Sequence, residues 1–409
     1  MVWIFSQMSA CRKLAILAAL FATLLMLLSC VNGSSGEQSA TALTDDLDRD
    51  SLRTAVQYSI AYLQKIPPEQ IVGEQPRVFT AGEILDSLQE FDRLLDDWSC
   101  RPCFAREIER RFELVPSSMD SATTEVLFTG YYQPVIDGSL VRTEKFRYPV
   151  YGRPADLIIA EQVLLKPQLS VEKIVGRAEG EDFLPYYTRR EIDQESRLEG
   201  RGLEIAWVAD PIELFFLHIQ GSGTIRLPDG TQLKIGYAGQ NGWPYRSIGR
   251  LLIENGKLSK DEMSMQRLRR YLRENSQEQS EIFNANPSYI FFRLNPAGPM
   301  GSLEVPVTAE RSLATDSRLF PQGALVLVTT EIPVVSGAGE LSGWRAVTRF
   351  MLNQDTGGAI RGPQRADIYF GADETAANLA GYMNRQGRMF FPVLRKANQR
   401  LPRTNAEDG

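Results

Sequence analysis

The stretch 355–371, DTGGAIRGPQRADIYFG, constrains the fold of this chain more than any other part of the sequence. In its last part, residues 365–370, polar and apolar residues alternate, which predicts a strand with one face on a hydrophobic core. The apolar residues of this run would share the buried face, so the carboxylate of Asp367 would point away from the core. We therefore expect a β region that carries a polar group on the open face of a strand.

A second aspartate, Asp355, stands twelve residues before Asp367 and follows the apolar run 344–352. Gly357 and Gly358 come next, and paired glycines let the backbone turn sharply or approach a ligand closely. Two strand-borne carboxylates joined by such a connection could form an acid/base site. Composition and spacing alone favour a plainer interpretation, with Asp355 in a turn and Asp367 in a surface ion pair.

Further segments upstream of this stretch carry a resemblance to a known family. They are FTGYYQPVIDGS (128–139), YPVYGRP (148–154), FLHIQGSGTIRL (216–227), GYAGQNGWPYRSIGRLL (236–252) and ATDSRLFPQGALV (314–326). In this order, and with 355–371, they resemble the MltA family of membrane-bound lytic murein transglycosylases and its 3D domain, named for three aspartates. Asp316 matches the remaining aspartate of that domain. The resemblance covers roughly residues 125–375.

The resemblance implies a mainly β fold with peripheral helices. Its larger domain would be a double-psi β-barrel, formed by residues 50–139, which also hold the helices, and by residues 300–400, the 3D segment. A second β-barrel-like domain would be inserted between them over residues 140–299. Glycan would lie in the groove between the two domains, and clefts between domains hold many ligand sites.

Hydrophobic periodicity and turn chemistry predict the local elements. Thr80 with Glu83, and Ser259 with Glu262, match the capping box that starts a helix. Pro228-Asp229-Gly230 predicts a hairpin turn. The first expected helix begins near residue 51, and further helices are expected over 80–95, 104–112, 245–255 and 263–272. The expected strands include 126–134, 205–208, 214–219, 224–227 and 289–293.

The family resemblance also implies an activity, cleavage of the β-1,4 bond between N-acetylmuramic acid and N-acetylglucosamine in peptidoglycan. The reaction would proceed without water and leave 1,6-anhydromuramic acid ends, so it would not need the two-carboxylate geometry of ordinary glycosidases. Asp367 matches the catalytic position and would act first as acid and then as base, with Asp355 and Asp316 supporting it. The expected substrate-binding residues are Thr129, Tyr131, Gln220, Ser222, Gly357 and Gly358.

This role requires a raised pKa for Asp367, which partial burial and the charge of Asp355 would supply. Arg365 would lower that pKa if it faced Asp367, and the sequence leaves open which neighbour prevails. Two alternatives remain at this point. One is a hydrolase in which Asp355 activates water, and the other is a non-catalytic peptidoglycan-binding lipoprotein.

The N-terminal segment predicts export. Arg12-Lys13 precedes the apolar run 14–28, which is shorter than the roughly 20 residues of a membrane-spanning helix, so residues 1–29 are expected to be a signal peptide. Residues 27–30, LLSC, resemble a lipobox with Cys30 as the lipidated first residue, although a plain cleaved signal is the alternative. Val31 favours anchoring at the periplasmic side of the outer membrane, with residues 30–49 as a tether.

Charge and composition exclude several other classes. The formal charge of −6 would become −8 after loss of residues 1–29, since that segment holds two basic residues and no acids, and this argues against a nucleic-acid partner. His218, the single histidine, is expected to be a structural strand residue, and one histidine excludes a two-histidine metalloprotease motif. The sequence shows no nucleotide, metal or flavin signature, so no cofactor is expected.

Two smaller features receive structural interpretations. Cys100 and Cys103 are expected to form a local disulfide, rather than a redox motif or part of a zinc site, because an exported protein meets an oxidising environment. The basic stretch 267–273 is expected to be the solvated face of a helix.

Overall fold

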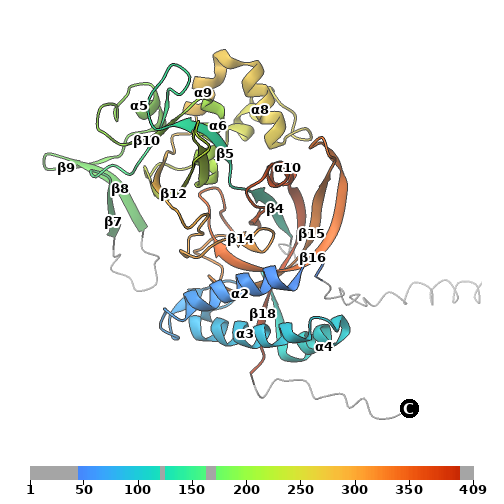
Figure 1. Cartoon of the computed structure of the whole chain (residues 1–409). Helices are drawn as coiled ribbons and strands as arrows, with labels where there is room; N and C mark the ends of the chain where they lie inside the picture. Colours follow the sequence, from blue (N-terminus) through green and yellow to red (C-terminus); the bar gives the residue numbers. More distant parts are fainter. Residues whose placement is uncertain (1–44, 120–124, 163–171, 397–409) are drawn as a thin grey trace, which may run out of the picture. The chain divides into compact units, whose positions relative to one another are not determined.

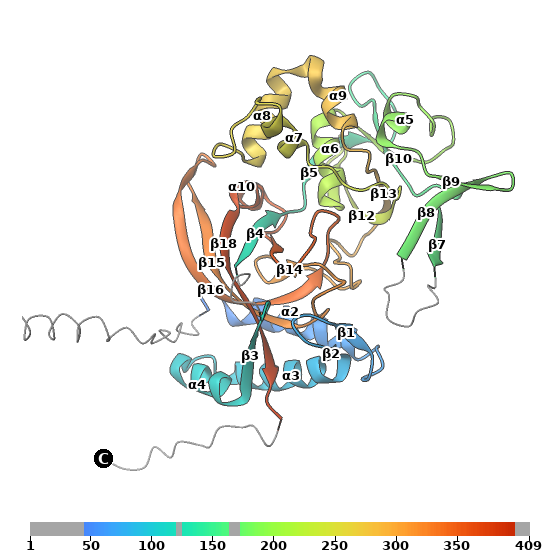
Figure 2. The same cartoon turned by 180° about the vertical axis from the view of Figure 1, so that it is seen from behind.

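The computed structural model describes residues 45–119, 125–162 and 172–396. Six strands close into a barrel in the order β15-β16-β14-β17-β4-β18, because β18 pairs back with β15 (Figures 1 and 2). Two neighbouring pairs are parallel, β14 with β16 and β17 with β4. The sheet continues from β18 to β3. The bounds are β3 (Phe112–Pro116), β4 (Val126–Tyr131), β14 (Ser312–Ala314), β15 (Leu325–Val335), β16 (Leu341–Asp355), β17 (Arg365–Tyr369) and β18 (Asn384–Leu394).

Strand β17 follows the predicted alternation. Ala366 and Ile368 are buried, whereas Asp367 on the opposite face keeps 19% of its side chain exposed. The prediction of a mainly β fold is thus confirmed, with a closed barrel at its centre. The double-psi form of the connections stays a prediction.

Three helices pack on one side of the barrel, α2 against β16 and α3 against β18 (Figure 1). The cap of α2 is Asp48 rather than a residue near 51. Thr80 caps α3 as predicted, but Glu83 pairs with Arg77 at 2.8 Å instead of closing the capping box. The Cys100–Cys103 disulfide is present at the start of α4. The bounds are α2 (Arg49–Leu63), α3 (Ala81–Leu94) and α4 (Arg101–Arg111), with the small pair β1 (Ile71–Gly73) and β2 (Phe79–Thr80) between the first two.

A second sheet has the strand order β13-β12-β11-β5-β10-β6, and a single bridge between Gly152 and Phe292 brings its two ends together. The predicted hairpin at residues 228–230 is confirmed between β11 and β12. A separate three-stranded sheet, β7-β8-β9, extends from this region (Figure 2). The bounds are β5 (Val135–Ser139), β6 (Tyr148–Tyr151), β7 (Ile158–Gln162), β8 (Glu172–Glu179), β9 (Asp182–Pro185), β10 (Glu204–Val208), β11 (Gly223–Arg226), β12 (Gln232–Gln240) and β13 (Ile290–Leu294).

The predicted strand at residues 214–219 is wrong, because this segment belongs to helix α6 (Pro211–Gln220). Asp210 caps the helix, and Gly221 ends it with a φ of 75°, a left-handed conformation that suits glycine. The helix is buried on most of its circumference, and a short apolar run does not distinguish such a helix from a strand. His218 is therefore a buried helical residue, with its Nδ1 at 3.0 Å from Nη1 of Arg189.

Two expectations for the following helices also need correction. Helix α8 (Met265–Glu274) is capped by Ser264, while Ser259 only accepts a hydrogen bond from Glu262 in a preceding turn. Its basic face is not simply solvated, because Arg269 keeps only 14% of its side chain exposed and pairs with Glu213 at 3.0 Å. The remaining helices are α5 (Arg189–Asp193), α7 (Ile248–Glu254), α9 (Gln279–Asn284) and α10 (Glu374–Tyr382).

The folded body begins before residue 50. Asp45 lies fully buried and pairs with Arg311 at 2.6 Å, and Asp46 pairs with Arg349 at 2.5 Å. The last residues of the expected tether are thus held on the barrel. The expected signal peptide and Cys30 lie outside the described residues, and no helix in the described part is long and apolar enough to cross a membrane.

Candidate active site

Strands β14 and β17 bring the two C-terminal aspartates into register. Ala314 pairs with Asp355 on one side and with Asp367 on the other. The two backbones are therefore two strand spacings apart, about 10 Å. The barrel thus places Asp355 and Asp367 on either side of Ala314, and their acid/base role stays a prediction.

The carboxylate of Asp367 lies in a small polar cluster. Its Oδ1 accepts a hydrogen bond from the Oγ1 of Thr129, its parallel register partner on β4. Nη2 of Arg365 lies 3.6 Å from the same oxygen and donates to Oγ1 of Thr129 at 3.1 Å. Arg365 therefore does face Asp367, which the sequence had left open.

Asp355 has a different set of partners at the end of β16. Its Oδ1 accepts from the backbone N–H groups of Ser302 at 2.9 Å and Thr356 at 2.8 Å. Its Oδ2 accepts from the hydroxyl of Tyr131 at 2.9 Å. Tyr131 in turn packs on Tyr369, with ring centroids 5.1 Å apart. Asp355 is thus fixed by donors on both oxygens.

Burial raises the pKa of both residues. The pKa of Asp367 rises to about 6, although the charge and hydrogen bond of Arg365 act against burial, and Asp355 adds a smaller raising effect. Burial also raises the pKa of Asp355 to about 6, against the hydrogen bonds of Thr356, Tyr131 and Ser302. Of the two neighbours, Arg365 thus has the larger effect on the pKa of Asp367, and burial outweighs it.

Asp316 is fully buried and supports the loop that joins the other two aspartates. It accepts from Nη2 of Arg318 at 2.6 Å and from the backbone N–H of Gly362 at 2.8 Å. Burial favours the neutral form, but these hydrogen bonds and the charge of Arg318 outweigh it and lower the pKa of Asp316. An ionised Asp316 thus holds Gly362, which lies in the connection between Asp355 and Asp367.

The expected substrate-binding residues fall into two groups. Thr129 and Tyr131 touch the aspartates directly, whereas the Oε1 of Gln220 accepts from the backbone N–H of Tyr132 at 3.0 Å. Ser222 is half-buried in the turn that follows α6. Gly357 and Gly358 lie in the loop after Asp355; a Cβ at Gly358 would meet no atom within 4 Å. That exposed position leaves room for a ligand to approach the backbone.

Some polar neighbours were missed from the sequence. Arg269 donates at 2.8 Å to the hydroxyl of Tyr132, the residue that follows Tyr131 in the chain. Burial raises the pKa of Tyr245, and the charges of Arg365 and Asp367 act on it as well. Tyr245 belongs to the segment 236–252 singled out above, and this was the available signal.

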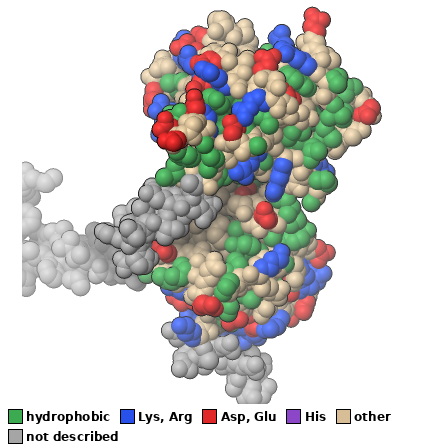
Figure 3. All heavy atoms as spheres, turned by 90° about the vertical axis from the view of Figure 1, so that its left-hand side faces the viewer, with side chains coloured by type: hydrophobic (Ala, Val, Ile, Leu, Met, Phe, Trp, Pro, Cys, Tyr) green, Lys and Arg blue, Asp and Glu red, His purple; other side chains and the backbone are tan. Residues whose placement is uncertain are grey.

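The wider surface carries mixed charge. On the face shown in Figure 3, basic and acidic side chains are interspersed over the described residues. Within the described ranges, no group of three or more His, Cys, Asp or Glu side chains is arranged to hold a metal ion.

The barrel, its inserted sheet and the three aspartates together define a class of protein. Comparison with known proteins identifies this class. The model of the MltA specific insert domain matches residues 127–293, and that of the 3D domain matches residues 311–391. The chain belongs to the MltA family.

Particular relatives agree with this assignment. The chain is 33% identical over 287 residues to the membrane-bound lytic murein transglycosylase A of Escherichia coli K12, covering 69% of this chain and 70% of that protein. A membrane-bound lytic murein transglycosylase structure from Agrobacterium tumefaciens is 30% identical, with a TM-score of 0.71 over 85% of this chain and 93% of that one. E. coli MltA with bound chitohexaose is 26% identical, with a TM-score of 0.61 over 84% and 90%.

Proposed function

We propose that this protein is a lytic transglycosylase that cleaves the β-1,4 bond between N-acetylmuramic acid and N-acetylglucosamine in peptidoglycan. The cleavage uses no water and leaves a 1,6-anhydromuramic acid end. The observation that carries the proposal is the strand-borne carboxyl of Asp367, whose pKa burial raises to about 6. The names of the relatives and the chitohexaose bound to one of them support the polymer as substrate.

One carboxyl performs both proton transfers. Protonated Asp367 gives its proton to the glycosidic oxygen as the bond from that oxygen to the muramic acid C1 breaks. The resulting carboxylate then takes the proton of the C6 hydroxyl as O6 bonds to C1, so the enzyme returns to its starting state. A pKa near the working pH suits a group that must both give and accept a proton.

Hydrogen bonding distinguishes the two carboxyl groups whose pKa is raised. Asp355 accepts from two backbone N–H groups and from Tyr131, so its oxygens are already engaged. Asp367 has Thr129 and Arg365 on one oxygen, Oδ1. We assign the acid and base role to Asp367 and a supporting role to Asp355 and Asp316. Thr129 orients the catalytic carboxyl, and Gly357 and Gly358 admit the glycan backbone.

Product analysis tests this assignment. The chain without residues 1–29 is incubated with purified murein sacculi, beside Asp367→Asn, and the soluble products are analysed by mass spectrometry. We expect muropeptides lighter by one water than hydrolytic products, and their loss in the variant. Full-mass reducing ends would instead support a hydrolase in which Asp355 activates water.

A third outcome would remove the enzyme assignment altogether. If neither protein releases muropeptides but both bind sacculi, the chain is a peptidoglycan-binding scaffold. Arg388→Gln is a suitable control, because Arg388 is exposed on β18 and should leave product release unchanged.

For location, we propose lipid attachment at Cys30 and anchoring to the periplasmic side of the outer membrane. The designation of the relatives as membrane-bound supports this. Cys30→Ala should move the protein from the membrane pellet to the soluble fraction, and retention in the pellet would contradict lipidation at this residue.

A further inference from the structure

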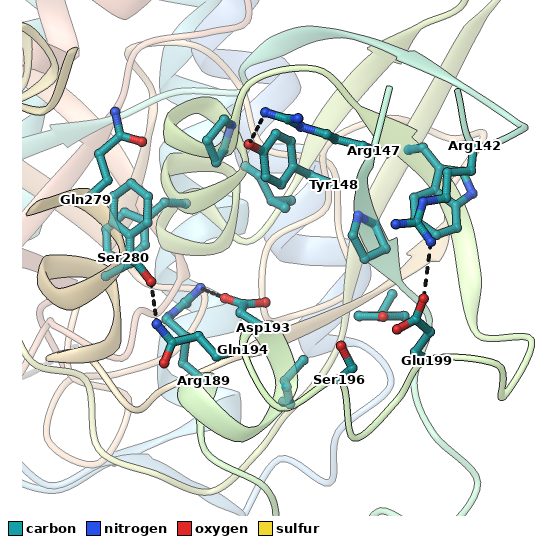
Figure 4. Close-up of a pocket in the computed structure, with 18 of the residues that line it drawn as sticks. Arg142, Arg147, Tyr148, Arg189, Asp193, Gln194, Ser196, Glu199, Gln279 and Ser280 are labelled. Atoms are coloured by element: carbon teal, nitrogen blue, oxygen red, sulfur yellow. Dashed lines mark hydrogen bonds and ion pairs between the residues drawn. The ribbon is translucent and has the colours of Figure 1, made fainter. Parts of the chain in front are cut away.

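A cavity of about 430 Å³ lies in the inserted region, lined by none of the three aspartates. Its volume falls within the roughly 300–1,000 Å³ of small-molecule sites. Figure 4 shows its labelled side chains around an open centre, with Gln279 and Ser280 opposite Arg142 and Glu199. The lining comes mainly from β6, β10, α5 and the loop that follows it, α9, the first turns of α6 and the loop between β5 and β6.

One part of the lining combines aromatic rings with arginines. The guanidinium of Arg142 lies 5.3 Å from the ring centroid of Trp207, and that of Arg147 lies 5.2 Å from that of Tyr148. Arg147 also donates to the hydroxyl of Tyr148 at 3.1 Å. Aromatic rings offer flat apolar faces to a ligand, and arginine suits carboxylates because its planar fork matches their geometry.

The opposite part of the lining is polar and firmly held. Asp193 pairs with Arg189 at 3.5 Å, while 37% of its side chain remains accessible in the cavity. Arg189 is itself buried and anchored by the carbonyl oxygens of Asn286 and Ser288. Gln194 donates to Ser280 beside them. A carboxylate held in this way has acceptor capacity for hydroxyl or amide groups of a ligand.

The charges narrow the class of ligand. Arg142 pairs with Glu199 at 3.1 Å and Arg189 with Asp193, so two of the cavity's arginines already have acidic partners. Arg147 is exposed, and its guanidinium donates to the neutral hydroxyl of Tyr148 rather than to an acid. The two acids would repel a phosphate dianion, whereas Arg147 suits one carboxylate. Rings for stacking, acceptors for hydroxyls and a cation for one carboxylate together fit an acidic sugar.

We infer that this cavity is a second glycan site that binds a carboxylate-bearing N-acetylated amino sugar of one or two rings, of the muramic acid type. The sugar ring stacks on Trp207, its carboxylate meets Arg147, and its hydroxyls or amide meet Asp193. The identity of the polymer rests on the proposed function. Helix α6 links the two sites, since Pro211 and Leu214 line the cavity and Gln220 at the other end contacts Tyr132. The ten residues of this helix span about 15 Å.

Binding of free N-acetylmuramic acid, with N-acetylglucosamine as the analogue that lacks the carboxylate, tests the inference. Titrations are followed by saturation-transfer NMR on the chain without residues 1–29 in its Asp367→Asn form. We expect N-acetylmuramic acid to bind more tightly than N-acetylglucosamine. Trp207→Ala should weaken both at least tenfold, and Arg147→Gln should abolish the preference for the acidic sugar.

Arg190→Gln is the matched control, because Arg190 is an exposed arginine of α5 outside the cavity lining, and it should bind like the parent. Thermal unfolding of each variant shows whether Trp207→Ala is folded; Arg147→Gln changes an exposed side chain and gives an independent reading. Binding unchanged by both cavity variants, or no binding of either sugar, would overturn the inference.

The same proteins separate this inference from the proposed function. If sacculi are not cleaved by the wild type, yet the acidic sugar binds and Arg147→Gln abolishes the preference, the proposed function fails and the cavity assignment stands. If sacculi are cleaved but the cavity substitutions leave sugar binding unchanged, only the cavity assignment is overturned.

Discussion

At the scale of single residues, the balance between burial and the charge of Arg365 sets the pKa of Asp367. Its carboxyl has a cation 3.6 Å away, which alone would lower its pKa, and burial nevertheless raises the pKa to about 6. The motif identified Asp367 as the candidate, since it lies in a recognisable strand pattern. The direction of the shift required the structure, because burial depends on segments more than 200 residues apart, such as β4 and β17.

Arg365→Gln should shift the pH dependence of cleavage. Without the cation the pKa of Asp367 rises further, so the protonated acid persists to higher pH. The alkaline limb of the pH–rate profile should therefore move to higher pH by up to about one unit. A shift of one unit corresponds to the loss of about 1.4 kcal/mol of interaction between Arg365 and the ionised form of Asp367. Release of soluble muropeptides measured from pH 4 to 9 checks this. An alkaline limb that stays in place, or moves down, would contradict the assigned balance.

At the scale of elements, sequence prediction succeeded where the chain pattern was distinctive. Strand β17 and the β11–β12 hairpin were predicted because alternation and a Pro-Asp-Gly turn are local signals. Helix α6 was misassigned because its residues are apolar nearly all round, which removes the helical periodicity. The position of Gln220 beside Tyr132 depends on that helix, so this part of the site could be named only by resemblance.

Asp316→Asn should loosen the loop between β16 and β17. The variant keeps the size of the side chain but loses the charge that binds Arg318 and the N–H of Gly362. We expect a loss of about 1–3 kcal/mol in unfolding free energy, the range for weakening buried charge-assisted hydrogen bonds. Faster hydrogen exchange at residues 357–364 and a lower kcat/KM on sacculi should accompany it.

The Asp316→Asn prediction has a clear contrary result. Unchanged exchange in the loop, with exchange in the barrel strands increased instead, would show that Asp316 supports the core and not the loop. Asp182→Asn, at an exposed position on β9, serves as the control for removal of one acidic charge.

At the scale of the whole molecule, the barrel is tied to the start of the described chain. Arg311 is fully buried and contacts Asp45, the hydroxyl of Ser51, and the carbonyl oxygens of Asp48 and Phe350. No local pattern predicted this contact, since 266 residues separate Asp45 from Arg311. The sequence described this region only as polar and small, which suggested a tether.

Asp45→Ala should destabilise the protein strongly. It leaves the buried guanidinium of Arg311 without its charge partner, and removal of one member of a buried ion pair costs about 3–5 kcal/mol. Urea unfolding followed by circular dichroism measures the change. Asp50→Ala removes the partner of Arg49 in an exposed pair and should change stability little. Equal effects of the two variants would contradict a special role for the buried pair.

The ion pair at Asp45 also limits the distance between a lipid anchor and the folded body of the protein. If Cys30 carries the lipid, Asp45, the first described residue and one that is held on the barrel, lies fifteen positions after the lipidated residue. A fully extended chain of that length reaches about 50 Å. The barrel would therefore reach only peptidoglycan within that distance of the membrane. Glycan strands farther away would not be cleaved.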